Sequence, residues 1–155
     1  MYIAAVGPYV CRVAGEVCDG LHVHPFHTVR YLDEVIRPAV AKGASLRDRD
    51  PSDIALATSV ILVTGRTEEE MAASRREAGK QIAFYASTPA YAGVLDLHGW
   101  DFGPQLPNLS LRGEWDAMAA LITDDVLEAV AVVAPVDELG PAIRARYGDR
   151  LTRIG

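Results

Sequence analysis

The sequence predicts an α/β fold with parallel strands, and two patterns along the chain carry that prediction. Apolar runs that could form buried strands recur at 2–6, 21–24, 54–63 and 130–134. Between them lie segments whose apolar residues repeat every three to four positions, as on one face of a helix. Strands that alternate with helices form parallel sheets with right-handed crossovers. The pattern leaves two architectures open, a doubly wound sheet and an arc of a (β/α)8 barrel, and residues 1–155 have the length of one domain.

The first βαβ unit occupies residues 2–24. Tyr2–Val6 is an unbroken apolar run, which is typical of a strand covered on both faces. Pro8 suits the first turn of a helix. The buried stripe of that helix is expected to comprise Val10, Val13, Ala14 and Val17. A second strand at 21–24 then ends before Pro25.

The next segment predicts a helix, a loop and the longest strand. Thr28 is placed to cap a helix whose apolar face consists of Val29, Leu32, Ile36 and Val40. Because Pro38 falls within that helix, we expect it to kink or shorten the helix. A polar loop at 42–53 leads into a third strand at 54–63.

The second half of the chain opens with a strong helix signal. Thr67 and Glu70 have the spacing of a capping box, and the helix that they start is expected to reach about Ala86. Weaker signals follow: an irregular segment at 87–108, helical pieces at 114–122 and 124–129, a strand at 130–134, and a last helix from about Asp137 with an unfavourable Gly140-Pro141 pair inside it.

Composition and charge exclude several classes of function. Half of the residues are hydrophobic and the formal net charge is −6, which argues against nucleic acid or a membrane surface as partner. No apolar run approaches the roughly 18–20 residues of a membrane span, and we see no signal peptide. Cys11 and Cys18 would lie about 10 Å apart on one helix, too far apart for a disulfide. We therefore expect buried thiols in a cytoplasmic protein.

The turn between the first strand and the first helix is a candidate anion site. Gly7 and Pro8 form it, and phosphate groups commonly bind where a strand enters a helix N-terminus. Glycine lets a ligand approach the backbone closely. The alternative is that Gly7-Pro8 is only a tight turn.

Histidines mark the end of the second strand. His22 and His24 share a face of that strand, and His24 and His27 lie at its carboxyl end. We consider two roles for His24 and His27: contact with a substrate or cofactor, and hydrogen-bonded structural histidines. The His-x-His spacing could serve a metal, but no third ligand is placed nearby, so we predict no metal site.

Six segments in order carry a family resemblance: YIAAVGP at 2–8, CRVAGEVCDG at 11–20, LHVHPF at 21–26, YLDEVIRPAV at 31–40, QIAFYASTPAY at 81–91 and WDAMAALI at 115–122. They resemble the luciferase-like monooxygenase family, and within it the oxidoreductases that depend on coenzyme F420, a deazaflavin. The family fold is a (β/α)8 barrel of about 250 residues or more. The resemblance implies a luciferase-like, TIM-barrel-like C-terminal half of four βα units, strands five to eight, without the first four strands.

The resemblance also implies a site and partners. The backbone of Ala4, Ala5, Val6 and Gly7 would approach the phosphate-bearing tail of F420 or, as the alternative, FMN. His24 and His27 would face a small organic substrate that exchanges a hydride with the cofactor. Because a half-barrel exposes sheet edges and apolar surface, we expect a homodimer or a complex with a separate N-terminal half. The alternative function is a non-catalytic, truncated paralogue that acts as a structural or partner-binding subunit.

Overall fold

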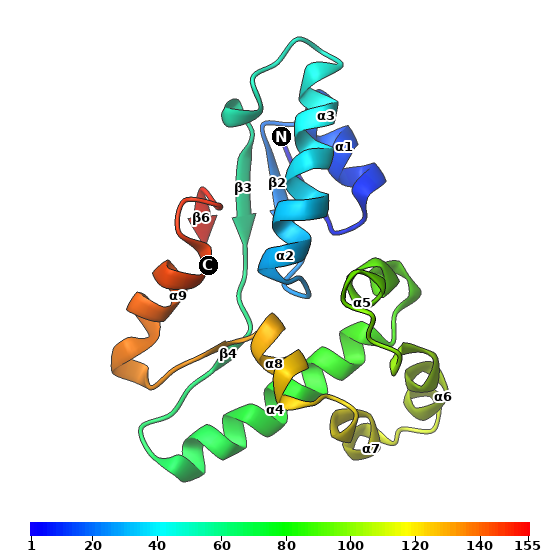
Figure 1. Cartoon of the computed structure of the whole chain (residues 1–155), viewed down its shortest axis with the longest axis vertical. Helices are drawn as coiled ribbons and strands as arrows, with labels where there is room; N and C mark the ends of the chain where they lie inside the picture. The colour runs from blue at the N-terminus through cyan, green and yellow to red at the C-terminus, as the bar shows by residue number, and fades with distance from the viewer. The chain divides into compact units, whose positions relative to one another are not determined.

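The computed structural model describes residues 1–155, whose contacts group into two compact units. Unit 1 comprises Met1–Val60 with Tyr147–Gly155, and unit 2 comprises Ile61–Arg146. Every strand pair in either unit is parallel. This arrangement of parallel strands and helices confirms the predicted α/β class (Figure 1). None of the helices combines the length and apolar character that a membrane crossing requires.

A four-stranded parallel sheet forms the centre of unit 1. Its strands follow the order β1-β2-β3-β6, with bounds Tyr2–Ala5, Gly20–Val23, Ala55–Thr58 and Arg153–Ile154. Leu21 and Val23 on β2 are fully buried, so the core of this unit lies around its second strand. Strand β1 pairs only with β2 and is an edge of the sheet.

Two helices of unit 1 pack unusually closely because each contributes a glycine to the contact. Helix α1 spans Pro8–Val17 and helix α3 spans Arg37–Ser45, and they lie side by side in Figure 1. A Cβ atom on Gly15 would overlap the carbonyl oxygen of Val40, and one on Gly43 would overlap that of Arg12. The two backbones can approach this closely only because neither position carries a side chain.

The expected effect of Pro38 appears as a change of helix type. Helix α2, Val29–Tyr31, is capped by Thr28 as predicted, and a π-helical turn at Leu32–Ile36 joins it to α3. The Arg37 N–H donates to the carbonyl of Leu32, five residues back. Pro38 therefore falls at the start of α3, where its missing N–H costs little. In place of the predicted kink, the helix thus contains one wider, π-helical turn.

The prediction of one long strand at 54–63 is wrong, because the segment forms two short strands. Strand β3 ends at Thr58, and β4, Leu62–Val63, belongs to the two-stranded sheet of unit 2. Beyond Thr58 the sheet of unit 1 has no partners left, since β2 ends at Val23 and β6 at Ile154. Strand β4 instead pairs with β5, Val132–Val133. Apolar runs mark burial, but the available partners decide where a strand ends.

Unit 2 is mainly helical and contains the 19-residue helix α4, Glu68–Ala86. The predicted cap is present: Thr67 Oγ accepts from the Glu70 N–H at 3.2 Å. The Glu70 carboxylate reaches back one residue further than expected, to the Arg66 N–H at 2.7 Å. The other helices are α5 (Ala92–His98), α6 (Leu106–Leu111), α7 (Trp115–Ala120), α8 (Asp124–Val130) and α9 (Leu139–Tyr147).

The expectation of an irregular segment at 87–108 is wrong, since most of it is helical. Prolines open its 3-10 turns at Pro89–Tyr91 and Gly103–Gln105 and lie in the first turn of α6. Prolines at these positions start helical turns rather than interrupt them. The same reasoning applies to α9, where Pro141 falls in the first turn instead of the interior.

Arginines cap the carboxyl ends of two helices. The Arg49 guanidinium donates to the carbonyls of Gly15 at 2.8 Å and Cys18 at 2.6 Å, at the end of α1. In unit 2, Arg146 donates to the carbonyls of Glu128, Ala129 and Ala131, at the end of α8. Both cations satisfy carbonyls that lack helical partners and complement the negative end of the helix dipole. Cys11 and Cys18 are buried free thiols, as predicted.

Candidate cofactor site

The loop between β1 and α1 leaves backbone donors at the start of α1 without a side-chain cap. Gly7 is the N-cap of α1 in an extended conformation, and no side chain caps the helix. The first helical hydrogen bond runs from the Cys11 N–H to the Gly7 carbonyl at 3.1 Å, so the amides of Tyr9 and Val10 have no acceptor within the helix. A Cβ atom on Gly7 would meet no atom within 4 Å. Uncapped amides at a helix N-terminus, next to a glycine with open space beside it, suit a phosphate group.

Ala4, Ala5 and Val6 lead into this loop with their backbones held by neighbouring elements. Ala4 is in register with His22, and the Ala5 carbonyl accepts from the His24 N–H at 3.1 Å. The Val6 carbonyl accepts from the Tyr31 hydroxyl at 3.3 Å. These residues therefore fix the position of the loop, while Gly7 and the first turn of α1 offer the donors.

His24 follows the last residue of β2 and is joined to the loop by its bond to Ala5. Its Nδ1 accepts a hydrogen bond from the Phe26 N–H at 3.1 Å, so the neutral ring carries its proton on Nε2. The ring is partly buried, and burial lowers the pKa of His24 below its usual 6.5. The site thus holds a neutral imidazole beside the end of β1.

His27 is fully enclosed, in contrast to His24. Its Nδ1–H donates to the His24 carbonyl at 2.8 Å, and its ring packs against Tyr147 at a centroid distance of 5.8 Å. Of the two histidines predicted to face a substrate, His24 is therefore the more accessible, and His27 holds the backbone of His24. The chain contains no group of three or more His, Cys, Asp or Glu side chains arranged to hold a metal ion.

Two further polar residues support the site and were not identified from the sequence. The buried Tyr31 hydroxyl fixes Val6, and the buried Thr58 hydroxyl donates to the Val23 carbonyl at 2.9 Å. Both bonds join residues far apart in the chain. Thr58 could have been noticed as the one hydroxyl residue in the strand Ala55–Thr58, whereas Tyr31 carried no signal beyond its place in a capped helix.

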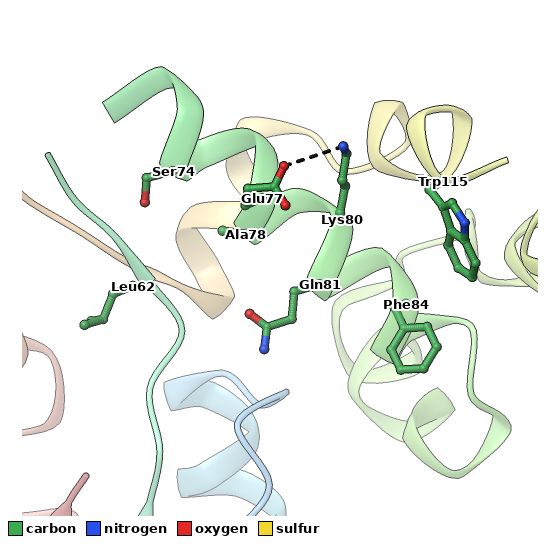
Figure 2. Close-up of a pocket in the computed structure, with 8 residues that line it drawn as sticks. All are labelled: Leu62, Ser74, Glu77, Ala78, Lys80, Gln81, Phe84 and Trp115. Carbon is green, nitrogen blue, oxygen red and sulfur yellow. Dashed lines mark ion pairs between the residues drawn. The ribbon is translucent and has the colours of Figure 1, made fainter. Parts of the chain in front are cut away.

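A separate hollow of about 490 Å³ lies beside α4 in unit 2 (Figure 2). Phe84 and Trp115 line it, are about half exposed, and have ring centroids 6.3 Å apart. The Lys80 ammonium is paired with Glu77 at 3.5 Å and with Asp116 at 3.2 Å. Because the one cation is already neutralised and the aromatics are exposed, this hollow resembles a docking surface more than a reaction site.

A family model described as luciferase-like monooxygenase matches residues 1–153. The chain belongs to the luciferase-like monooxygenase family. The match covers both units and includes the β1–α1 loop and His24, so the candidate site lies within the matched region.

Two curated relatives have different degrees of similarity. An uncharacterised protein of Mycobacterium tuberculosis is 47% identical over 155 residues, and the match covers 99% of this chain and 46% of the relative. The 5,10-methylenetetrahydromethanopterin reductase of Methanolobus tindarius is 25% identical over 157 residues, with coverage of 99% and 46%. The luciferase-like chain thus spans less than half the length of the relatives it matches.

A solved structure supports the same fold. The coenzyme F420-dependent tetrahydromethanopterin reductase from Methanopyrus kandleri superposes with a TM-score of 0.75 at 21% identity, covering 99% of this chain and 43% of the reductase. The predicted luciferase-like, TIM-barrel-like fold class is therefore confirmed, and the chain matches part of such a barrel.

Proposed function

We propose that this chain is one half of an F420-dependent oxidoreductase that transfers a hydride to or from a small organic substrate. The single observation that carries the proposal is the β1–α1 loop, with its uncapped helix and the open space in front of Gly7. Membership of the luciferase-like family and the F420 dependence of the Methanopyrus kandleri reductase support it.

The residues at the loop would hold the phosphate-bearing tail of the cofactor. The amides of Tyr9 and Val10 would donate to phosphate oxygens at the positive end of α1. Gly7 would let the group approach the backbone, and Ala4, Ala5 and Val6 would keep the loop in place through their bonds to β2 and Tyr31. When bound, F420 would supply a two-electron hydride donor or acceptor.

His24 would face the substrate as a neutral imidazole. Its lowered pKa keeps the ring uncharged near neutral pH, with the proton on Nε2 while Nδ1 accepts from Phe26. A neutral ring can donate a hydrogen bond to a substrate oxygen without placing a cation in the site. His27 would position His24 by binding its carbonyl.

The proposal includes association of this chain with another polypeptide. The outer edge of β1 has no strand partner. Tyr2 on β1, and Tyr9 and Val17 on α1, are each more than half exposed. An unpaired parallel edge with exposed apolar side chains beside it favours pairing with another strand and packing against another helix. The partner would be the remaining part of a luciferase-like barrel or a second copy of this chain.

Titration of the protein with F420 and with FMN, monitored by cofactor fluorescence, tests the cofactor assignment. Light scattering measures association of the chain. Micromolar binding of F420 that exceeds the binding of FMN supports the proposal. Tighter binding of FMN would change the cofactor to a flavin. If neither binds and the chain still associates, a non-catalytic, partner-binding subunit is the better interpretation.

A further inference from the structure

The helical segment that follows α4 lines a small apolar cavity that is partly open to solvent. The cavity has a volume of about 200 Å³ and is formed entirely by residues 86–107 of unit 2. Its apolar walls include Ala86, Pro89, Ala92, Leu95, Trp100 and Pro104. It is separate from the β1–α1 loop, and nothing in the proposed oxidoreductase function uses it.

A helix-ending motif fixes the position of Trp100 at this cavity. Gly99 ends α5 in the left-handed conformation with φ 66°. The Gly99 N–H then donates to the Asp96 carbonyl at 3.2 Å, and the Trp100 N–H to the Leu95 carbonyl at 3.0 Å. This paired closure brings the residue after the glycine against the last turn of the helix. The Trp100 ring is also stacked on His98, with centroids 4.4 Å apart.

The remaining walls are equally fixed. Pro89 and Pro104 lie at the starts of 3-10 turns, and Pro107 lies in the first turn of α6. Gly103 packs so closely that a Cβ atom there would lie 2.7 Å from Leu95 Cδ2. Prolines and close packing restrict the motion of these walls, so a ligand would not have to order them on binding.

One charged side chain lines the cavity. Asp96 contributes a carboxylate, and no Lys, Arg or His lines the walls to neutralise it. The polar groups beside it, Ser87 and Thr88, are uncharged. The cavity therefore offers an apolar interior with a single negative charge at an exposed residue, which favours a ligand that is apolar at one end and cationic at the other.

We propose that this cavity binds a small organic cation, consisting of one six-membered ring with a short ammonium arm. A dry apolar cavity of about 150 Å³ is large enough for benzene, so the volume here accommodates one ring and one or two further atoms. The ring occupies the space among Leu95, Trp100 and Pro104, and the ammonium group pairs with Asp96.

Benzylamine, benzyl alcohol and benzoate test the proposal, since they share a ring and differ in charge. The full chain carries two tryptophans, so Trp115→Phe leaves Trp100 as the only fluorescent indole. Saturable change of Trp100 emission is expected, with benzylamine binding about two- to fivefold more tightly than benzyl alcohol, the range of one exposed ion pair, and benzoate most weakly. Asp96→Asn should make benzylamine and benzyl alcohol equal.

A pair of matched variants locates the binding. Ala92→Phe adds a ring to the cavity wall and should abolish binding of all three probes. Ala90→Phe adds the same ring outside the lining, and because Ala90 and Ala92 are both exposed, it is a matched control that should leave binding unchanged. The proposal is overturned if emission does not saturate, if Asp96→Asn leaves the preference for benzylamine intact, or if Ala92→Phe binds like Ala90→Phe. Circular dichroism confirms that each variant is folded.

Discussion

The hydroxyl of Tyr31 donates a hydrogen bond to the carbonyl of Val6, and this bond joins the second helical segment to the candidate cofactor loop. Tyr31 is itself held by its N–H, which donates to Thr28 Oγ at 3.0 Å. The cap at Thr28 therefore fixes the residue that precedes Gly7. A local helix-capping interaction thus positions a loop that lies more than twenty residues earlier in the sequence.

Tyr31→Phe removes this bond while it preserves the buried ring. We expect the free energy of unfolding to fall by about 1 kcal/mol, because one hydrogen bond is lost and a buried carbonyl loses its partner. Binding of F420 should weaken severalfold as the loop loosens. Urea denaturation and a cofactor titration measure both effects, and unchanged binding in a destabilised variant would show that Tyr31 supports only the fold.

Gly15→Ala should destabilise the chain strongly, whereas Gly79→Ala should not. The added methyl on Gly15 overlaps the Val40 carbonyl and forces α1 and α3 apart, at a cost of about 1–3 kcal/mol. At Gly79, within α4, a Cβ atom meets nothing within 4 Å, so alanine should stabilise the helix by about 0.5–1 kcal/mol. In thermal denaturation, Gly15→Ala should lower the midpoint temperature and Gly79→Ala should raise it. Shifts of both midpoints in the same direction would contradict the close packing of α1 and α3.

Arg49→Met should cost more stability than Arg47→Met. Arg49 donates two charged hydrogen bonds to the end of α1, and their loss should lower the free energy of unfolding by about 1–3 kcal/mol. Arg47 is mostly exposed and pairs with Glu16 only at 3.7 Å, so its replacement should cost about 0.5 kcal/mol or less. Equal losses in urea denaturation would rule out helix capping by Arg49.

The lowered pKa of His24 predicts a pH dependence of stability. Between its folded pKa and the unfolded value of 6.5, the unfolded chain binds more protons at His24 than the folded chain does. The contribution of His24 is therefore complete above pH 6.5 and is lost as the pH falls through the folded pKa. His24→Gln should flatten this part of the profile in denaturation from pH 5 to 7.5. If the stability of the variant depends on pH as steeply as that of the parent, groups other than His24 cause the dependence.

Local chemistry explains what the sequence predicted correctly. Thr28 and Thr67 cap helices because a hydroxyl next to a helical segment can accept from an amide three residues later, whatever the rest of the fold does. The parallel α/β class follows from alternation along the chain and needs no knowledge of pairing. The Gly7-Pro8 turn was identified from two adjacent residues and likewise needs no knowledge of pairing.

Long-range pairing explains what was missed. The break after Thr58 depends on where β2 and β6 end, and β6 itself is two residues long with an exposed arginine, so it has no apolar pattern. The burial of His27 depends on Tyr147, far away in the sequence. Periodicity locates a helix, but the tertiary fold sets which face is buried and which residues pair. Val10 and Val17, expected in the buried stripe of α1, are exposed.

The most direct test of the central claim replaces Gly7 with aspartate and with asparagine and measures F420 binding by calorimetry. Both residues are good N-caps and should stabilise α1 by comparable amounts, so any difference between them reports charge. The account predicts that Gly7→Asp binds F420 about tenfold or more weakly than Gly7→Asn, through repulsion of a phosphate at close range. Equal affinity of the two variants would contradict the assignment of this loop to the cofactor tail.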